Sequence, residues 1–116
     1  MKKTVSLKEN HLFRRAYSRG KTAADSRLAL YLRRNGQKSN RLGLTVSTKV
    51  GGAVVRNRVR RRLWEIYRLN EERLGGGWDV VVVARVRAAE SGYRQLEKSF
   101  LKLADRLELL RREKTP

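Results

Sequence analysis

Six arginines stand between positions 56 and 68, in the stretch VRNRVRRRLWEIYR, and they are the residues most suited to binding an anionic ligand. A guanidinium is planar and can hold two phosphate oxygens, so arginines spaced along a helix can follow a sugar-phosphate backbone. Glu65 is the only acid in this interval, and like charges without partners destabilise a helix. A solvated charged face is the simpler explanation, but the missing counter-charge favours nucleic-acid binding.

Residues able to cleave a phosphodiester are scarce. Such cleavage needs convergent carboxylates that hold metal ions, or a positioned general base such as histidine. His11 is the only histidine, and Glu71, Glu72 and Glu108 occupy helical positions typical of surface pairs. We therefore identify no catalytic residue in this chain, leave its metal ligands open, and expect it to contribute binding and charge neutralisation.

The arginines belong to a predicted helix over 54–72, which the glycines at 75–77 end. One arc of its helical wheel is apolar and comprises Val55, Val59, Leu63, Ile66 and Leu69. The rest of the wheel is polar and comprises Arg56, Asn57, Arg58, Arg60, Arg61 and Arg68. Arg62 falls inside the apolar arc, where its stem can pack while its head reaches water. Trp64 faces outward, where it could stack on a base or cover neighbouring arginines, and both interpretations stand.

Helices are also predicted at the two ends of the chain. Ser6 and Glu9 have capping-box spacing, and the first helix is expected to run to about Arg19. Ser91 is the expected N-cap of the last helix. Its apolar stripe comprises Tyr93, Leu96, Phe100, Leu103, Leu107 and Leu110.

Strands fill the intervals between these helices. Alternating apolar residues predict strands in RLALYLRR (27–34) and RLGLTVSTK (41–49), and the turn formers at 35–40 favour an antiparallel hairpin between them. A shorter strand is weakly indicated near Lys21 to Ala23. The run WDVVVVAR (78–85) has no polar alternation, which is typical of an interior strand covered on both faces.

Size and composition limit the possible function classes. The 116 residues suffice for a single domain, 1–116, whose last residues from about 111 we expect to fray. A formal net charge of +18 points to a polyanionic partner, and 40% hydrophobic residues exclude a disordered basic tail. Without cysteine, a disulfide framework is excluded. No membrane span or signal peptide is indicated, so we expect a cytoplasmic protein.

Aromatic residues could form a second binding surface. Phe13 and Tyr17 share one side of the first helix, and Tyr31 points away from the predicted core positions of its strand. Such rings can stack unpaired bases with little sequence preference, although residues at the spacing of Phe13 and Tyr17 more often belong to a core. The neighbouring polar and basic candidates are Thr45, Ser47, Lys49 and Arg14.

The sequence resembles the protein component of bacterial ribonuclease P. The resemblance depends on KVGGAVVRNRVRRRLWE, with SLKENHLFRRAYSRG upstream and VVVAR downstream, and it extends over nearly the whole chain. Three positions depart from the family's usual residues: Gly52 stands where Asn is usual, Thr48 where Lys is common and Trp64 where Arg is common.

The resemblance implies an α+β fold, a single-domain α/β sandwich of element order αβββαβα. Its four-stranded mixed sheet would contain a left-handed βαβ crossover, as in folds like the second domain of ribosomal protein S5, although the general rule favours right-handed crossovers.

The resemblance also implies a role as the protein subunit of an endoribonuclease that removes the 5′ leader of precursor tRNA. The catalytic RNA subunit would contact Arg56, Asn57, Arg58, Arg60 and Arg61. The leader would lie in a cleft between the first helix and the sheet. The residues expected to bind it are Phe13, Tyr17, Tyr31, Thr45, Ser47, Lys49 and Arg14. The RNA subunit and substrate would hold Mg²⁺ and perform hydrolysis. The expected partners are this RNA and precursor tRNA, without a membrane or an obligate protein partner.

Three competing functions share parts of this pattern. A structural RNA-binding protein would share the charge and the mixed fold, but it would not need exposed rings. A DNA-binding module could read base edges with Asn57, yet no helix stands close before 54–72 to complete a helix-turn-helix. An autonomous nuclease would have to cleave without RNA.

Overall fold

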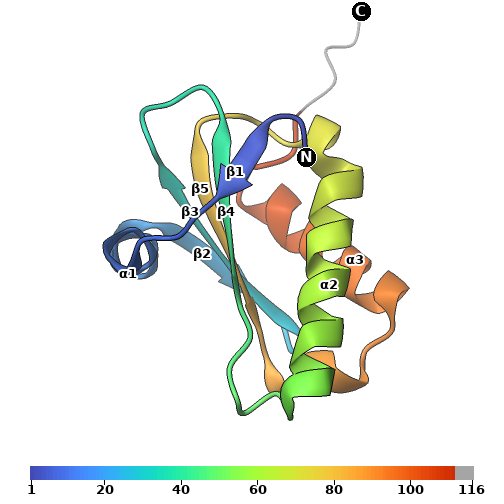
Figure 1. The fold of residues 1–116 in the computed structure, drawn as a ribbon. Coiled ribbons are helices and arrows are strands. Elements are labelled where there is room, and N and C mark those ends of the chain that lie inside the picture. Colours follow the sequence, from blue (N-terminus) through green and yellow to red (C-terminus); the bar gives the residue numbers. More distant parts are fainter. Residues whose placement is uncertain (112–116) are drawn as a thin grey trace, which may run out of the picture.

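The computed structural model describes residues 1–111, which form one five-stranded sheet with helices on both faces (Figure 1). The strands are β1 (Thr4–Ser6), β2 (Lys21–Ala24), β3 (Leu28–Arg34), β4 (Asn40–Thr45) and β5 (Trp78–Ala84). The α-helices are α1 (Asn10–Arg19), α2 (Ala53–Asn70) and α3 (Tyr93–Arg106). Short 3₁₀ helices occupy Glu71–Arg73 and Val86–Glu90.

The sheet has the order β1-β4-β5-β3-β2, with β5 in the middle. β5 pairs antiparallel with β3 and parallel with β4. The predicted hairpin between β3 and β4 is therefore wrong, because β5 lies between them. Val80, Val81 and Val82 are all buried, and an apolar strand of this kind is best placed where both of its faces are covered.

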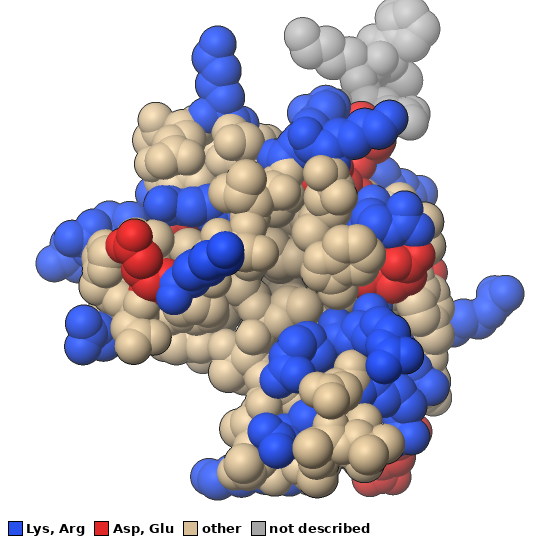
Figure 2. All heavy atoms as spheres, in the orientation of Figure 1, with Lys and Arg blue, Asp and Glu red and all other residues tan. Residues whose placement is uncertain are grey.

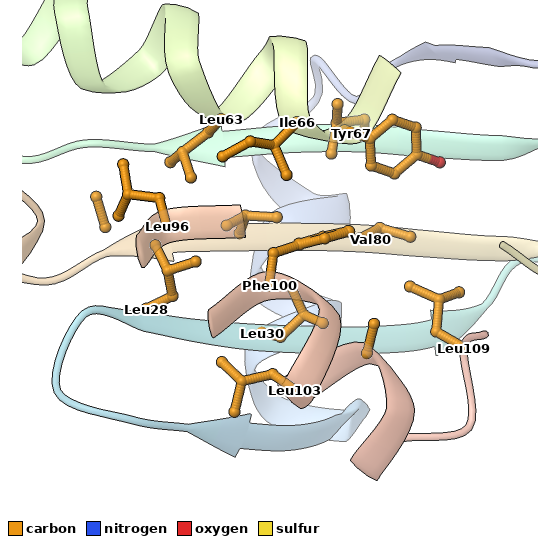
Figure 3. Close-up of a cluster of buried hydrophobic side chains, with 14 of the residues drawn as sticks. Leu28, Leu30, Leu63, Ile66, Tyr67, Val80, Leu96, Phe100, Leu103 and Leu109 are labelled. Carbon is orange, nitrogen blue, oxygen red and sulfur yellow. The ribbon is translucent and has the colours of Figure 1, made fainter. Parts of the chain in front are cut away.

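The two faces of the sheet bury different residues. Leu28, Leu30 and Leu32 of β3 are fully buried, as predicted, and contribute to the main core beneath α2 and α3. Figure 3 shows this cluster, in which side chains of α2 and α3 meet those of the sheet. On the opposite face α1 covers Val81 with a smaller cluster that comprises Leu7, Leu12 and Ala16.

The N-terminal segment differs from its prediction. Thr4–Ser6 form the edge strand β1, which runs parallel to β4, and α1 begins only at Asn10. Ser6 therefore lies in a strand and makes no capping box, and Glu9 is the N-cap residue without a side-chain cap bond. This strand is three residues long, which is too short to show a periodic pattern in the sequence. Its pairing with β4 stabilises it.

Two details of the later helices also differ from their predictions. Leu69 is 58% exposed, and Tyr67 is buried in its stead. The Tyr67 hydroxyl lies 3.0 Å from Thr4 Oγ1 and accepts a hydrogen bond from Asn40, which explains how a polar ring atom is satisfied in the core. Ser91 does not cap α3: Gly92 is the N-cap residue, and the Ser91 hydroxyl donates to the Arg87 carbonyl at 2.7 Å.

The predicted fold class is confirmed, with one strand more than expected. α2 connects the parallel neighbours β4 and β5, and the crossover has a left-handed sense: in Figure 1 both strands run downward, β4 lies in front, and α2 lies to the right. The weakly indicated strand near Lys21 is present as β2. Within residues 1–111 no helix is long and apolar enough to cross a bilayer. The predicted fraying concerns mainly residues 112–116, which lie outside the described part of the chain.

Candidate nucleic-acid interface

The outward face of α2 carries the cations that the wheel predicted. Val59, Leu63 and Ile66 are buried against the sheet and α3, which fixes the rotation of the helix. Asn57, Arg58 and Arg61 are consequently exposed, and Arg56 and Arg60 are half-buried. Figure 2 shows Lys and Arg side chains gathered over the lower, N-terminal half of this helix.

In the N-terminal half of this face, the described acceptors of the guanidinium groups are neutral. Arg56 Nε donates to the Gly51 carbonyl at 3.1 Å, and Arg58 Nη2 donates to the Ala89 carbonyl at 3.2 Å. Arg60 Nη1 donates to Asn57 Oδ1 at 3.0 Å. Within residues 1–111, neither these arginines nor Arg61 form an ion pair with a carboxylate. Within the described part of the chain their charge therefore has no carboxylate partner, and the remaining N–H groups can donate to an anion.

Arg68, at the other end of the helix, behaves differently. Its Nε donates to Glu65 Oε2 at 3.1 Å, and Nη2 contacts the other carboxylate oxygen. This hydrogen bonding lowers the pKa of Glu65 and raises the pKa of Arg68. The one acid of the arginine stretch thus neutralises Arg68 and leaves the N-terminal half of α2 cationic.

Arg62 holds α2 against the segment that precedes α3. Its Nη1 donates to the Ser91 carbonyl at 2.9 Å, and the residue is half-buried. The helical wheel predicted that its stem packs and its head reaches water, whereas in the structure the head donates to a backbone carbonyl. Arg62 therefore has a structural role.

Three aromatic rings form a flank beside α1, which we call the aromatic flank: Phe13, Tyr17 and Tyr31. The centroids of Tyr17 and Tyr31 lie 5.0 Å apart in an edge-on arrangement, and those of Phe13 and Tyr17 lie 6.4 Å apart. The Tyr17 hydroxyl lies 2.9 Å from Thr45 Oγ1, within hydrogen-bonding distance. The structure thus brings together four of the predicted residues, from α1, β3 and β4.

Gly43 makes room for Phe13 of the aromatic flank, and this glycine was not identified from the sequence. A Cβ at this position would lie 2.5 Å from Phe13 Cε1, so only glycine lets the ring approach β4 this closely. Leu12 and Ala16 anchor the buried side of α1 on the same face of the sheet. A glycine inside an alternating strand indicates close approach of another group, and that signal was present in RLGLTVSTK.

The remaining predicted members of this surface stand apart. β4 ends at Thr45, so Ser47 and Lys49 lie in the loop before α2, where both are exposed. Arg14 is exposed on α1. No described hydrogen bond or aromatic contact joins these three side chains to the rings. Exposed His11 lies 3.3 Å from Glu9, which agrees with a surface position.

A groove of about 550 Å³ separates α2 from the N-terminal half of α1. Its α2 wall comprises Asn57, Arg60, Arg61 and Trp64. The facing apolar residues include Leu7, Phe13, Leu42, Gly43 and Leu44. In Figure 2 this hollow has an uncharged floor, with basic groups beside it. The groove therefore adjoins both the cationic face and the aromatic flank.

Asp79 has a structural role. Asp79 is fully buried and forms a two-point ion pair with Arg41, with Nε–Oδ1 and Nη2–Oδ2 distances of 2.6 and 2.9 Å. Across residues 1–111, no group of three or more His, Cys, Asp or Glu side chains could hold a metal ion.

Comparisons with known proteins agree with this geometry. The family model described as Ribonuclease P matches residues 1–108. The ribonuclease P protein component of Alkaliphilus oremlandii is 40% identical over 110 residues, which cover 95% of this chain and 96% of the relative. That of Caldanaerobacter subterraneus is 46% identical over 101 residues, 87% of each chain.

Solved structures show the same architecture. The RNase P protein of Staphylococcus aureus superposes with a TM-score of 0.84 at 27% identity, covering 91% of this chain and 97% of that one. The RNase P protein of Thermotoga maritima gives a TM-score of 0.80 at 28% identity, covering 87% and 96%. A family match over almost the full described length, together with these relatives, places the chain in the bacterial ribonuclease P protein family.

Proposed function

We propose that this chain is the protein subunit of a cytoplasmic ribonuclease P holoenzyme, in which it assists removal of the 5′ leader from precursor tRNA. The observation that carries the proposal is the uncompensated charge on α2. Arg56, Arg58, Arg60 and Arg61 have no carboxylate partner within residues 1–111. Because they project from a helix fixed by its buried side, they can contact the backbone of the RNA subunit together with Asn57.

The aromatic flank supports a separate contact with the single-stranded leader. Tyr17 is 40% exposed, and Phe13 and Tyr31 are half-buried, so ring surface is accessible while the rings stay fixed. Stacking on rings tolerates any base, which suits leaders of different sequence. Thr45 can hydrogen-bond the sugar-phosphate backbone of the leader. Exposed Arg14, Ser47 and Lys49 can contact its phosphates where the leader extends beyond the aromatic flank.

In this proposal the protein orients and neutralises, and the RNA subunit performs hydrolysis with Mg²⁺. Holding the leader removes orientational freedom from the substrate before the chemical step. The cations of α2 reduce the repulsion between two RNA molecules that must approach each other. Both effects should be greatest when little Mg²⁺ is present to screen the phosphates.

Reconstitution with the cognate RNA subunit tests the proposal. Cleavage of precursor tRNA would be measured at low Mg²⁺ with and without this chain, using mature tRNA binding as a reference. We expect faster cleavage and tighter precursor binding when the chain is present. If the chain leaves both quantities unchanged, the proposal is wrong. Cleavage by the chain without RNA would instead support an autonomous nuclease.

A further inference from the structure

We propose that the groove between α2 and α1 receives one unpaired base of the RNA subunit and that Trp64 stacks on it. The inference rests on the proposed function, and it assigns to this groove a ligand class, an unstacked nucleotide. It concerns a side chain that stands where the family commonly has arginine. The contact would therefore be a property of this chain rather than of the cationic face in general.

The surroundings of Trp64 leave its ring available. The side chain is 40% exposed and lines the groove. The one described cation over its ring is Arg68, whose guanidinium carbon lies 6.0 Å from the ring centroid, at the limit of a cation–π contact. Arg68 is also held by Glu65. The cation–π contact with Arg68 thus leaves part of the ring exposed along the groove.

The other tryptophan, Trp78, has a ring that protein cations cover. It is only 8% exposed. Arg34 lies over its ring at 4.2 Å and Lys21 at 5.0 Å. Trp78 is therefore part of the folded core, whereas Trp64 presents its ring to the groove.

The groove has the chemistry of a nucleotide site. Half-buried Leu44 and Phe13 supply apolar surface for the face of a base, above the buried Leu7 and Leu42. Arg60 and Arg61 lie at the same groove and can bind the phosphate. Its volume of about 550 Å³ is in the range of small-molecule sites, about 300 to 1,000 Å³.

Asn57 adds a donor for the edge of the base. Its Oδ1 accepts a hydrogen bond from Arg60, and no described residue bonds to its amide nitrogen. That nitrogen can therefore donate to a ring nitrogen or carbonyl oxygen of the base.

The lining favours the RNA subunit over the leader as the source of the base. All polar side chains that the argument uses belong to α2, the helix assigned to the RNA subunit. Of the aromatic flank, Phe13 lines the groove, and Tyr17, Tyr31 and Thr45 do not. A leader strand that stacks on Tyr17 and Tyr31 would thus occupy a neighbouring surface, which meets the groove only at Phe13.

Binding of the RNA subunit alone, without substrate, tests the assignment. Trp64→Ala should weaken binding by about 5- to 150-fold, the loss expected for one base stack, while the slope of log K against log salt stays unchanged. Trp64→Phe should retain most of the affinity. Leu69→Ala is the matched control, because Leu69 is an exposed apolar residue of the same helix outside the groove.

Tryptophan fluorescence provides a second readout. The chain has two tryptophans, and only Trp64 should be quenched when a base stacks on it. Emission of the native protein should fall on adding the RNA subunit, and that of Trp64→Phe, which reports the buried Trp78 alone, should not. Quenching that appears only with leader-bearing substrate would overturn the assignment to the RNA subunit.

The outcomes separate this inference from the proposed function. If Trp64→Ala binds like Leu69→Ala while Arg58→Ala weakens binding, the base site is wrong and the proposed interface stands. If none of these variants changes binding, both are wrong.

Discussion

On α2, Arg56 and Arg58 each reach a neutral carbonyl through one described hydrogen bond, whereas beside α1 the Tyr17 ring is fixed from several directions. The Tyr31 ring packs against it in a T-shaped arrangement, Phe13 lies one turn earlier on α1, and Thr45 Oγ1 lies within hydrogen-bonding distance of its hydroxyl. The arginine heads lie at the ends of long stems, and the rings lie against a sheet.

This difference follows from the range of the two interactions. A charge acts on a phosphate across several ångströms, so an arginine can shift and still contribute. Stacking requires direct contact between planar surfaces, and a displaced ring contributes little. Each arginine removed from the cationic face should therefore weaken RNA binding by a small and similar amount. A substitution at Gly43, which displaces Phe13, should instead weaken leader binding by the aromatic flank as a whole.

The largest effect is expected from Gly43→Val. The new side chain would overlap Phe13, so we expect a loss of about 1 to 3 kcal/mol in stability from overpacking. Displacement of Phe13 should also remove most discrimination between precursor and mature tRNA. Chemical denaturation and binding to both RNAs measure these effects. Gly52→Ser, at the N-cap of α2 where nothing crowds a new side chain, is the control and should fold normally. Unchanged leader affinity in Gly43→Val would show that Phe13 does not bind the leader.

A smaller loss is expected from Tyr17→Ala. Removing the ring that contacts both other rings should lower affinity for leader-bearing substrate by about 1 to 3 kcal/mol and spare mature tRNA. Tyr17→Phe keeps the ring and loses only the contact with Thr45, so it should retain most of the affinity. Equal losses for both RNAs would indicate a folding defect rather than a lost stack.

Arg58→Ala should act on the other region alone. Removing one phosphate contact should weaken binding to the RNA subunit and reduce the salt slope by about 0.9. Affinity measured over a series of salt concentrations gives this slope. Arg94→Ala removes the same charge from an exposed position of α3 and should leave the slope nearly unchanged. Equal slopes for the two variants would remove Arg58 from the interface.

The smallest effect is expected at Asp25, which belongs to neither surface. Burial raises the pKa of Asp25, but hydrogen bonds from the Leu28 N–H, Ser99 and the Arg27 N–H, with Lys102 nearby, hold it at about 2, below the ordinary 3.8. A lowered pKa stabilises the folded state above pH 3.8, and the gain is lost as pH falls toward 2.

Asp25→Asn should accordingly lower the free energy of unfolding by about 1 kcal/mol at neutral pH. The difference from the native protein should shrink below pH 3.8. Binding of the RNA subunit and of the leader should not change, which gives a baseline for stability effects alone. A deficit independent of pH would show that the carboxylate charge does not stabilise the fold.

Local patterns in the sequence predicted the elements that bury a regular stripe. The alternation of Leu28, Leu30 and Leu32 and the helical spacing of Val59, Leu63 and Ile66 determine which side each element buries. They also placed the α2 cations on the surface. Phe13 and Tyr17 could be assigned to one side of α1, although their contact with Tyr31 required the sheet.

Features that depend on distant partners could not be predicted in this way. β1 exists because β4 and the end of α2 hold it: Leu7 donates to the Leu42 carbonyl at 2.8 Å, and Glu71 accepts from the Lys2 N–H at 3.2 Å. Periodicity describes one segment and not its neighbour, so it did not reveal β5 between β3 and β4. The hydrogen bonds that satisfy the buried Tyr67 hydroxyl likewise join residues far apart in sequence.

The central place of β5 has a consequence for synthesis. The middle strand of the sheet is the last one that the ribosome makes, so β3 and β4 must wait for it with their inner edges unpaired. A nascent chain that stops before Trp78 has no way to join the two halves of its sheet. Folding should therefore be a late, cooperative event that follows the synthesis of β5.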